Sequence, residues 1–313
     1  MRREQRRWLL RRTTLWLVPL LLLSLPGFAY EMAAWGYNRF GQADALSGNF
    51  VAVSTGVYFS LALRADGTLA AWGENAFGQL DLPYGKGFRA IAAGGYHAVA
   101  LRSDGSLVSW GRAADGRTTV PEGFDFVAIS AETYHSLALR ADGSVVAWGN
   151  DDFGQCDVPE GANFVAVAAG RFHSVALRAD GSIVAWGRND DGQTNAPRSG
   201  SFVAIAAGGD HSLALRRDGS IAAWGSNYRG ESDVPEEGGF VAISAGTYHN
   251  LALRSDGALV GWGDDVFHLA TPPVESIVVF DAGVHHNLAL YDPYLTLSRE
   301  GVEPALDDRC SPH

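Results

Sequence analysis

The chain repeats a pattern of three short apolar runs separated by turn residues. The copy that begins at Phe164 reads Phe-Val-Ala-Val-Ala-Ala-Gly, Arg-Phe, His-Ser-Val-Ala-Leu-Arg, Ala, Asp-Gly and Ser-Ile-Val-Ala-Trp-Gly. Short apolar runs bounded by Gly and Asp are typical of β-strands. The Asp-Gly pair between two runs predicts a hairpin with a type I′ turn, which needs positive φ at both residues. A fourth, weaker strand is expected after Trp-Gly, in the stretch Gly-Gln-Cys-Asp-Val-Pro.

The spacing of the repeat predicts the architecture. Trp-Gly pairs occur seven times, and each step between them is 37 or 38 residues. Every pair after the first follows an Asp-Gly pair by six residues, and prolines come eleven residues after six of the tryptophans. Three or four strands in a unit of about 40 residues are typical of a propeller blade. We therefore predict an all-β, seven-bladed β-propeller; the alternative is an open β-solenoid.

The two ends of the array favour the propeller. The last copy starts at Ile277 and stops after Tyr291 without a Trp-Gly strand, whereas the first copy, at Trp35, has no strands before its Trp-Gly. Residues 31–46 can therefore complete the blade begun at 277–290, which closes the ring and hides the strand edges. A solenoid would need caps at both ends, and none is visible. We assign residues 30–296 to the propeller and 297–313 to a polar C-terminal tail.

The N-terminus is expected to be a signal peptide. Six arginines between Arg2 and Arg12 precede an apolar run from Leu15 to Leu25, and Gly27 and Ala29 follow at small-residue positions. This order predicts secretion to the cell exterior or the periplasm, with cleavage near Ala29 and no stable membrane insertion afterwards. The alternative is an uncleaved signal anchor that tethers the protein to the membrane.

Charge and cysteine content narrow the set of partners. The formal net charge is -11, and the first 29 residues are basic, so the rest is more acidic still. An acidic surface repels phosphate backbones, which excludes nucleic acid as the expected partner. Only Cys156 and Cys310 are present, too few for a disulfide scaffold, and the sequence does not show whether they pair.

The recurring histidines do not predict a metal site or a catalytic pair. Histidine occupies one position of the repeat in six copies, and Phe59 takes the seventh: His97, His135, His173, His211, His249 and His286. Equivalent positions in seven blades lie on a ring, too far apart for ligands that must meet at one ion. Ser and His adjoin in sequence, but neighbours on a strand point to opposite faces, which argues against a Ser-His pair. We expect structural histidines, no metal and no cofactor.

Strand polarity predicts one functional face. Because the chain reverses at each turn, the Asp-Gly turns share one face, and the turn before His and the turn after Trp-Gly share the other. The second face would present aromatic rings, and two charged residues that replace aromatics there join them as candidate binding residues. The candidates are Phe40, Tyr58, Phe77, Tyr96, Tyr134, Phe153, Phe172, Asp210, Tyr228, Arg229, Tyr248 and Phe267. Aromatics with short polar neighbours suit protein recognition; alternatively, the rings before His fold inward and cap the blades.

Departures from the repeat also concentrate on this face, as expected of a site that breaks the symmetry. They are Asp115, Glu132, Arg171, Asp191, Asp210, Arg229, Phe267, His268 and His285.

The consensus V-A-I-A-A-G-x-x-H-S-L-A-L-R-x-D-G-x-V-x-A-W-G-x-N-x-x-G-Q resembles the repeats named after the regulator of chromosome condensation, over about residues 31–290. The resemblance implies a seven-bladed propeller. The short unit, the signal peptide and the Val-Pro ending look most like the secreted bacterial branch, typified by the propeller-type β-lactamase-inhibitory protein. That branch implies a non-enzymatic binder that uses aromatic loop residues on one face. The nuclear branch implies nucleotide exchange on a small GTPase, which the export signal and acidic charge disfavour.

The sequence therefore favours a secreted, monomeric, non-enzymatic propeller that binds a protein, as an inhibitor of a β-lactamase or another extracytoplasmic enzyme. The first alternative is a lectin-like propeller that binds carbohydrate through the same rings. The less favoured alternative is a polysaccharide-acting enzyme, for which Asp191, Asp210 and Arg229 are the only candidate group.

Overall fold

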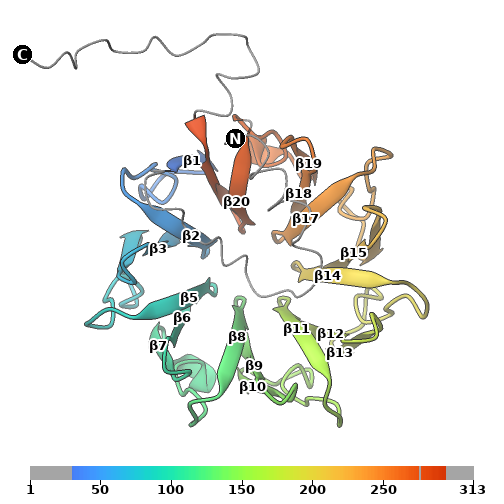
Figure 1. Ribbon diagram of the computed structural model, residues 1–313, viewed down its shortest axis with the longest axis horizontal. Helices are drawn as coiled ribbons and strands as arrows, with labels where there is room; N and C mark the ends of the chain where they lie inside the picture. The colour runs from blue at the N-terminus through green and yellow to red at the C-terminus, as the bar shows by residue number, and fades with distance from the viewer. Residues whose placement is uncertain (1–29, 275, 294–313) are drawn as a thin grey trace, which may run out of the picture.

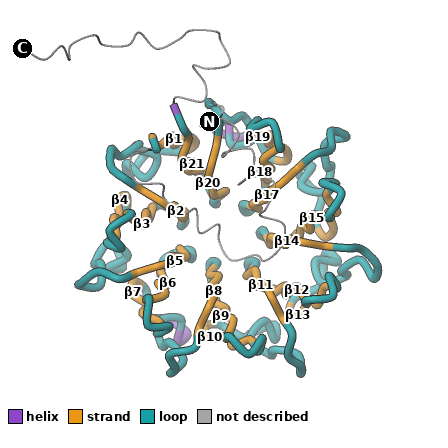
Figure 2. Tube along the Cα trace, in the orientation of Figure 1, coloured by secondary structure: helices purple, strands orange, loops and turns teal. Residues whose placement is uncertain are grey.

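The computed structural model describes residues 30–274 and 276–293. The expected signal peptide, the C-terminal tail and Cys310 lie outside these residues. The described chain forms seven three-stranded antiparallel sheets arranged as blades around a central axis (Figure 1). This confirms the all-β, seven-bladed propeller. Between the strands, the connections are loops, with short 3-10 turns at Ala114–Gly116 and Val266–His268 (Figure 2). Among the residues placed by the structure, no helix is long and apolar enough to cross a membrane.

Each blade contributes one strand to each of three positions. The strands nearest the axis are β2 (Phe50–Thr55), β5 (Phe88–Ala93), β8 (Phe126–Ala131), β11 (Phe164–Ala169), β14 (Phe202–Ala207), β17 (Phe240–Ala245) and β20 (Ile277–Ala282). The middle strands are β3 (Phe59–Arg64), β6 (His97–Arg102), β9 (His135–Arg140), β12 (His173–Arg178), β15 (His211–Arg216), β18 (His249–Arg254) and β21 (His286–Tyr291). The outer strands are β4 (Leu69–Gly73), β7 (Leu107–Gly111), β10 (Val145–Gly149), β13 (Ile183–Gly187), β16 (Ile221–Gly225), β19 (Leu259–Gly263) and β1 (Glu31–Gly36). We number the blades 1 to 7 from β2–β4 to β20–β21–β1.

The ring closes as the mismatched ends predicted. Strand β1 pairs antiparallel with β21, so that Trp35 lies opposite Asn287 and the seventh sheet has the order β1-β21-β20. The Trp35 Nε1–H donates to the Leu269 carbonyl of blade 6 at 3.2 Å. The same bond joins other neighbouring blades, for example Trp110 Nε1 to Gln79 O at 2.9 Å. The closing blade therefore makes the same tryptophan bond to blade 6 as blade 2 makes to blade 1, whereas the buried Trp72 Nε1 of blade 1 has no hydrogen-bond partner in the described chain.

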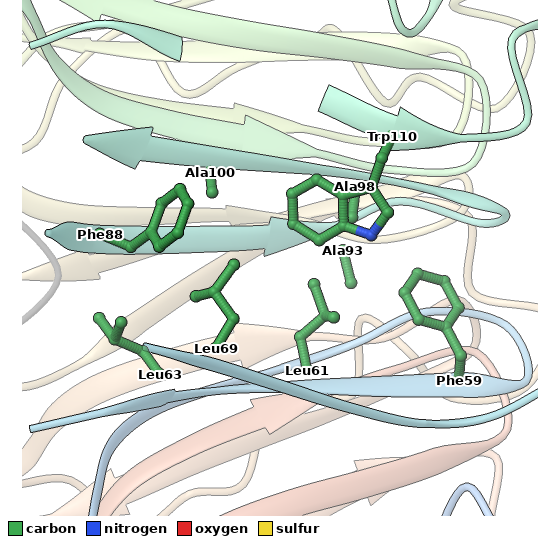
Figure 3. Packing of buried hydrophobic residues seen from close by; sticks show 9 residues of the cluster. All are labelled: Phe59, Leu61, Leu63, Leu69, Phe88, Ala93, Ala98, Ala100 and Trp110. Atoms are coloured by element: carbon green, nitrogen blue, oxygen red, sulfur yellow. The ribbon is translucent and has the colours of Figure 1, made fainter. Parts of the chain in front are cut away.

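The hydrophobic core is divided into clusters that lie between the blades. Between blades 1 and 2, Leu61, Leu63 and Leu69 face Phe88 and Trp110 of the next sheet (Figure 3). Burial of such side chains is worth about 1.5–3 kcal/mol each. The recurring Trp is thus part of the packing between blades.

The Asp-Gly hairpins differ from the type I′ turns that were expected. Only the glycine adopts positive φ, as at Gly67 with φ 79°. The Arg64 N–H donates to Thr68 O, and Gly67 N–H donates to Arg64 O. This is a three-residue loop with glycine in the left-handed conformation. Asp66 remains at negative φ because its Oδ1 accepts the Thr68 N–H at 3.0 Å and the Thr68 hydroxyl at 2.7 Å; these bonds also lower the pKa of Asp66.

The expected fourth strand does not form in any described blade. In blade 1, the loop after Trp-Gly is closed by its own side chains: Asn75 Oδ1 accepts the Leu80 N–H, and Gln79 Oε1 accepts the Phe77 N–H. Asn75 Nδ2 also donates to Asp81 Oδ1 at 3.1 Å. The loop thereby satisfies its backbone groups locally instead of pairing with the outer strand. The proline near its end has no N–H to give to a strand ladder.

Replacing Asp151 by asparagine is expected to stabilise the protein by about 0.5–1 kcal/mol. Asp151 stands in blade 3 where blades 1, 5 and 7 have an asparagine that donates to an aspartate six residues later. In blade 3 two carboxylates, Asp151 and Asp157, take these positions. Thermal and urea unfolding of Asp151→Asn measures the gain. The reverse change, Asn75→Asp, should cost a similar amount; equal stability of both variants and the parent would contradict this role.

Candidate protein-binding face

Each inner strand runs from the Asp-Gly face of the ring to the opposite face. The start of β5 lies at the Asp-Gly turn of blade 1, where Phe88 N–H donates to Gly67 O. Its end leads into the turn before His97. The loop after Trp110 and Gly111 contacts this turn, because Arg112 N–H donates to Tyr96 O. The turns before His and the loops after Trp-Gly are therefore neighbours. We call these fourteen segments together the aromatic face: turns 56–58, 94–96, 132–134, 170–172, 208–210, 246–248 and 283–285, and loops 37–44, 74–81, 112–119, 150–157, 188–195, 226–233 and 264–271.

Rings from the two kinds of segment meet in pairs. The ring centroids of Phe77 and Tyr96 are 5.3 Å apart, and those of Phe153 and Phe172 are 5.0 Å apart. Phe40, in the loop of blade 7, lies 5.2 Å from Tyr58 of blade 1. The rings before the His position are partly buried, whereas Phe40, Phe77 and Phe153 are 42–45% exposed. The first set thus partly caps the blades and supports the second set, which faces solvent.

The aromatic residues are not spread evenly around the propeller, and a first group of them lies at the closing blade. Around the closing blade, Tyr37 joins Phe267 at 5.2 Å and Tyr58 at 6.0 Å, and His285 stacks on Tyr58 at 5.3 Å. The sequence interpretation did not include Tyr37 or His285 among the binding residues. Tyr37 was missed because the equivalent residues of other blades are not aromatic, for example Glu74 in blade 1. From the sequence, His285 is identified only as a departure from the repeat.

A second group combines rings with arginines on blades 3 and 4. Tyr134 and Phe172 stack at 4.6 Å with nearly parallel planes. The guanidinium of Arg171 lies 5.5 Å from the Phe172 centroid, and that of Arg188 lies 5.9 Å from it. Arginine over an aromatic face is a favourable cation–π arrangement. The remaining exposed candidates are Tyr228, at 87%, Phe267, at 49%, and Arg229, whose side chain is also 49% exposed.

The three residues nominated for catalysis do not form one group. Asp210 pairs with Arg188 at 3.5 Å, and Arg188 also lies within electrostatic reach of Asp191. Arg229 instead pairs with Asp264 of the next blade at 2.5 Å and stacks on Tyr248 at 4.8 Å. The arrangement gives ion pairs that fix the loops and does not direct Arg229 at the two carboxylates.

Glu132 stands at the mouth of the central channel, where the other blades have glycine. The position is crowded: a Cβ built at Gly94 would lie 2.6 Å from the Glu132 carbonyl of the next blade. Burial raises the pKa of the Glu132 carboxyl, and the bonds from Thr133 and the charge of Arg171 oppose this shift. Glu132, Arg171 and Asp210 come from consecutive blades, so three of the departures meet at one sector of the mouth.

The central channel has a volume of about 670 Å³ and is lined by the inner strands of all seven blades. Most of its lining consists of Ala, Val and Ile. Asp281 is the charged residue that the closing blade contributes to the lining: its Oδ2 accepts the Thr55 N–H and hydroxyl of blade 1, both at 2.8 Å. Burial raises the pKa of Asp281. This carboxyl therefore joins the first and last inner strands.

The histidines form bonds between blades that the sequence interpretation missed. His97 Nε2 lies 2.8 Å from Ser136 Oγ of the next blade, and His211 Nε2 lies 2.7 Å from Asn250 Oδ1. Neighbours on one strand do point apart, as expected, but each His meets the serine or asparagine one blade further on. Equivalent pairs are His135–Ser174, His173–Ser212, His249–Asn287 and His286–Ser60.

These pairs hold the imidazoles in one neutral form. In five of the six pairs the partner oxygen can only accept, because it is an Asn Oδ1 or a serine Oγ that already donates to a loop carbonyl, so His Nε2 carries the proton there. The Nδ1 atoms have no hydrogen-bond partner within the described chain. Burial lowers the pKa of His97 and His135 to about 3. The rings are therefore neutral structural groups at neutral pH.

One junction replaces this bond by an apolar contact. Blade 1 has Phe59 in place of the histidine, and blade 2 has Ala98 in place of the serine that it would meet. Both residues are fully buried in the same cluster (Figure 3). Both members of the pair differ from the repeat together, so that neither an imidazole nor a hydroxyl is left without its partner at this position.

No group of three or more His, Cys, Asp or Glu side chains that could hold a metal ion occurs within residues 30–274 and 276–293.

The family described as the Regulator of chromosome condensation (RCC1) repeat matches residues 50–79, 88–117, 126–155, 164–193, 202–231 and 240–268. The chain belongs to the RCC1 repeat family. These stretches run from each inner strand into the loop after Trp-Gly, and they leave out the divided closing blade. No curated protein matches the sequence.

Solved RCC1-like propellers share the fold at low identity. Prp20p from Saccharomyces cerevisiae is 17% identical with a TM-score of 0.73, over 88% of this chain and 95% of that one; its structure is described with its binding to Gsp1p and histones. Yeast RCC1 (Prp20) has also been solved bound to Kap60, with 17% identity, a TM-score of 0.72 and coverage of 88% and 93%. Human WBSCR16 is 19% identical with a TM-score of 0.70, over 84% and 99%.

Proposed function

We propose that this RCC1-repeat propeller is a non-enzymatic protein that binds a protein partner through its aromatic face. The observation that carries the proposal is the set of exposed rings on that face: Phe40, Phe77, Phe153, Tyr228 and Phe267. The first three rest on partly buried rings, and such rigid aromatic contacts give large binding area at low entropic cost. The yeast relative Prp20p, described with its binding to Gsp1p and histones and solved bound to Kap60, supports the same class of role.

The proposal includes secretion and inhibition. The basic and apolar N-terminal segment supports export, and a rigid ring with one contact face suits a protein that blocks an enzyme outside the cytoplasm. We propose a β-lactamase or another extracytoplasmic enzyme as the partner, on the resemblance to the secreted branch. Carbohydrate binding through the same rings is the competing outcome of the test below.

Alanine at Phe77, Phe153 and Tyr228 together is expected to weaken capture of the partner by at least about tenfold, since single aromatic contacts at interface centres contribute about 2 kcal/mol or more. The partner is identified by affinity capture from the native host with the mature chain, and binding of the isolated partner is then measured by calorimetry. A glycan array run with the same chain detects a carbohydrate ligand instead.

The matched control is Tyr84→Ala with Phe124→Ala. These rings are 99% and 75% exposed and lie outside the aromatic face, in the loops before β5 and β8. The control should bind normally. Normal binding by the aromatic-face variant, or an equal loss in both variants, would reject this face as the site.

A further inference from the structure

The charge of the propeller is concentrated on the aromatic face. The fourteen segments of that face carry fifteen Asp and Glu residues and six Arg residues. The remainder of the described chain carries fourteen acidic and ten basic residues. The candidate binding face is therefore strongly acidic, whereas the rest of the molecule is close to balanced.

Within the face, blades 3 and 4 carry the densest acidic group around an exposed ring. Loops 150–157 and 188–195 contain five aspartates and one arginine. We call these five aspartates and Phe153 the acidic sector: Asp151, Asp152, Phe153, Asp157, Asp190 and Asp191. All but Asp191, which is half-buried, are exposed.

One contact inside the protein shows what chemistry the sector accepts. The Arg188 guanidinium lies 5.5 Å from the centroid of Phe153, and its Nε donates to Asp190 at 2.7 Å. A cation is thus held over the ring and paired with a carboxylate at the same time. The other aspartates lie on the same two loops, most of them exposed, and their carboxylates are available to cations from outside.

We propose that the partner of the aromatic face presents a segment rich in Arg and Lys, and that this segment docks on the acidic sector. The inference rests on the proposed protein-binding function and adds the chemistry of the partner. Carboxylates that surround exposed rings attract a basic surface over about a Debye length, and guanidinium groups can then stack on the rings. An acidic or uncharged partner would leave this excess of carboxylates uncompensated.

The test compares two synthetic twelve-residue peptides of equal aromatic content, one with alternating Arg and Lys and one with Glu at the same positions. Fluorescence anisotropy measures their binding to the mature chain at about 20 and 200 mM salt. We expect the basic peptide to bind at least tenfold more tightly than the acidic one and to weaken at the higher salt. Equal binding of both peptides would overturn the proposal.

The variant D152N/D190N/D191N locates the site. It should weaken binding of the basic peptide at least fivefold. The control variant E160Q/E236Q/E237Q changes the net charge by the same amount at exposed positions outside the aromatic face, and it should change binding less than twofold. An equal effect in both variants would mean a general charge effect and would reject the acidic sector.

Binding of the captured partner to both variants distinguishes failure of the proposed binding face from failure of the proposed basic partner. If the alanine variant of Phe77, Phe153 and Tyr228 loses the partner but D152N/D190N/D191N binds it with unchanged affinity and salt dependence, the face is the binding site and the basic partner is wrong. If neither variant loses the partner, both proposals fail.

Discussion

Acidification from pH 6.5 to 5 is expected to lower the free energy of unfolding steeply. Burial lowers the pKa of His97, His135, His173 and His286 to about 3 and that of His249 to about 4, and it also lowers the pKa of His211. A histidine in the unfolded chain has a pKa of about 6.5. The unfolded state therefore binds protons that the folded state excludes, and each such site costs up to about 1.4 kcal/mol per pH unit.

The sign of this pH dependence of the unfolding free energy follows from the lowered pKa of the histidines in the folded state. The stability due to these histidines is complete above pH 6.5 and is lost as the pH falls toward the folded pKa values. Asp281 and Glu132 act in the opposite direction, because burial raises their pKa values and the folded state binds their protons first. Their two protons offset only part of the uptake by six histidines.

Urea unfolding at several pH values between 5 and 7 measures the proton uptake from the slope of the free energy against pH. The matched variant is His135→Phe with Ser174→Ala, which copies the Phe59–Ala98 junction. It should reduce the uptake on unfolding by about one proton. A slope near zero in the parent, or the same slope in the variant, would show that the histidines are not buried in the neutral form.

Replacing Phe59 by histidine is expected to destabilise the protein by about 2–4 kcal/mol. The new ring would fill the position less well, and its Nε2–H would face the Ala98 methyl with no acceptor. Adding Ala98→Ser should recover much of the loss, since the serine hydroxyl can accept from the imidazole and donate to the Gln79 carbonyl, as Ser174 does to Gln155.

A double-mutant cycle on Phe59→His and Ala98→Ser measures this coupling by chemical unfolding. The single change Ala98→Ser supplies the control and should cost less than Phe59→His. Additive effects of the two changes would contradict the pairing between blades, because independent sites would show no rescue.

The repeat predicted the fold because every blade carries the same local signals. The Trp-Gly spacing indicated the seven blades, and the missing strands near Trp35 and Tyr291 indicated the closure, which the pairing of β1 with β21 confirms. The hairpin type was wrong because Asp66 bonds to Thr68 instead of adopting positive φ. The fourth strand was wrong because Asn75 and Gln79 close the loop through side-chain bonds that the apolar pattern does not reveal.

Contacts between blades were the part that the sequence could not provide. The pairing of His97 with Ser136 depends on how two sheets are placed, which one copy of the repeat does not encode. The joint departure of Phe59 and Ala98 from the repeat was a signal that could have suggested it. Likewise, the sequence predicted that the rings share a face, but the stacking of Tyr134 on Phe172 and the cluster around Tyr37 depend on the curvature of the ring.

The pairing of β1 with β21 also sets the order in which the protein can be completed during translation. Six blades use contacts within one repeat and between neighbours, so each can form once it has emerged from the ribosome or from an export channel. Strand β1 ends at Gly36, and its partner strand ends at Tyr291. At about 5–20 residues per second, the first strand must wait roughly 13–50 s before its partner is synthesised. Until then, the nascent chain exposes an unpaired strand at its start, and the last step of folding is a search between its most distant parts.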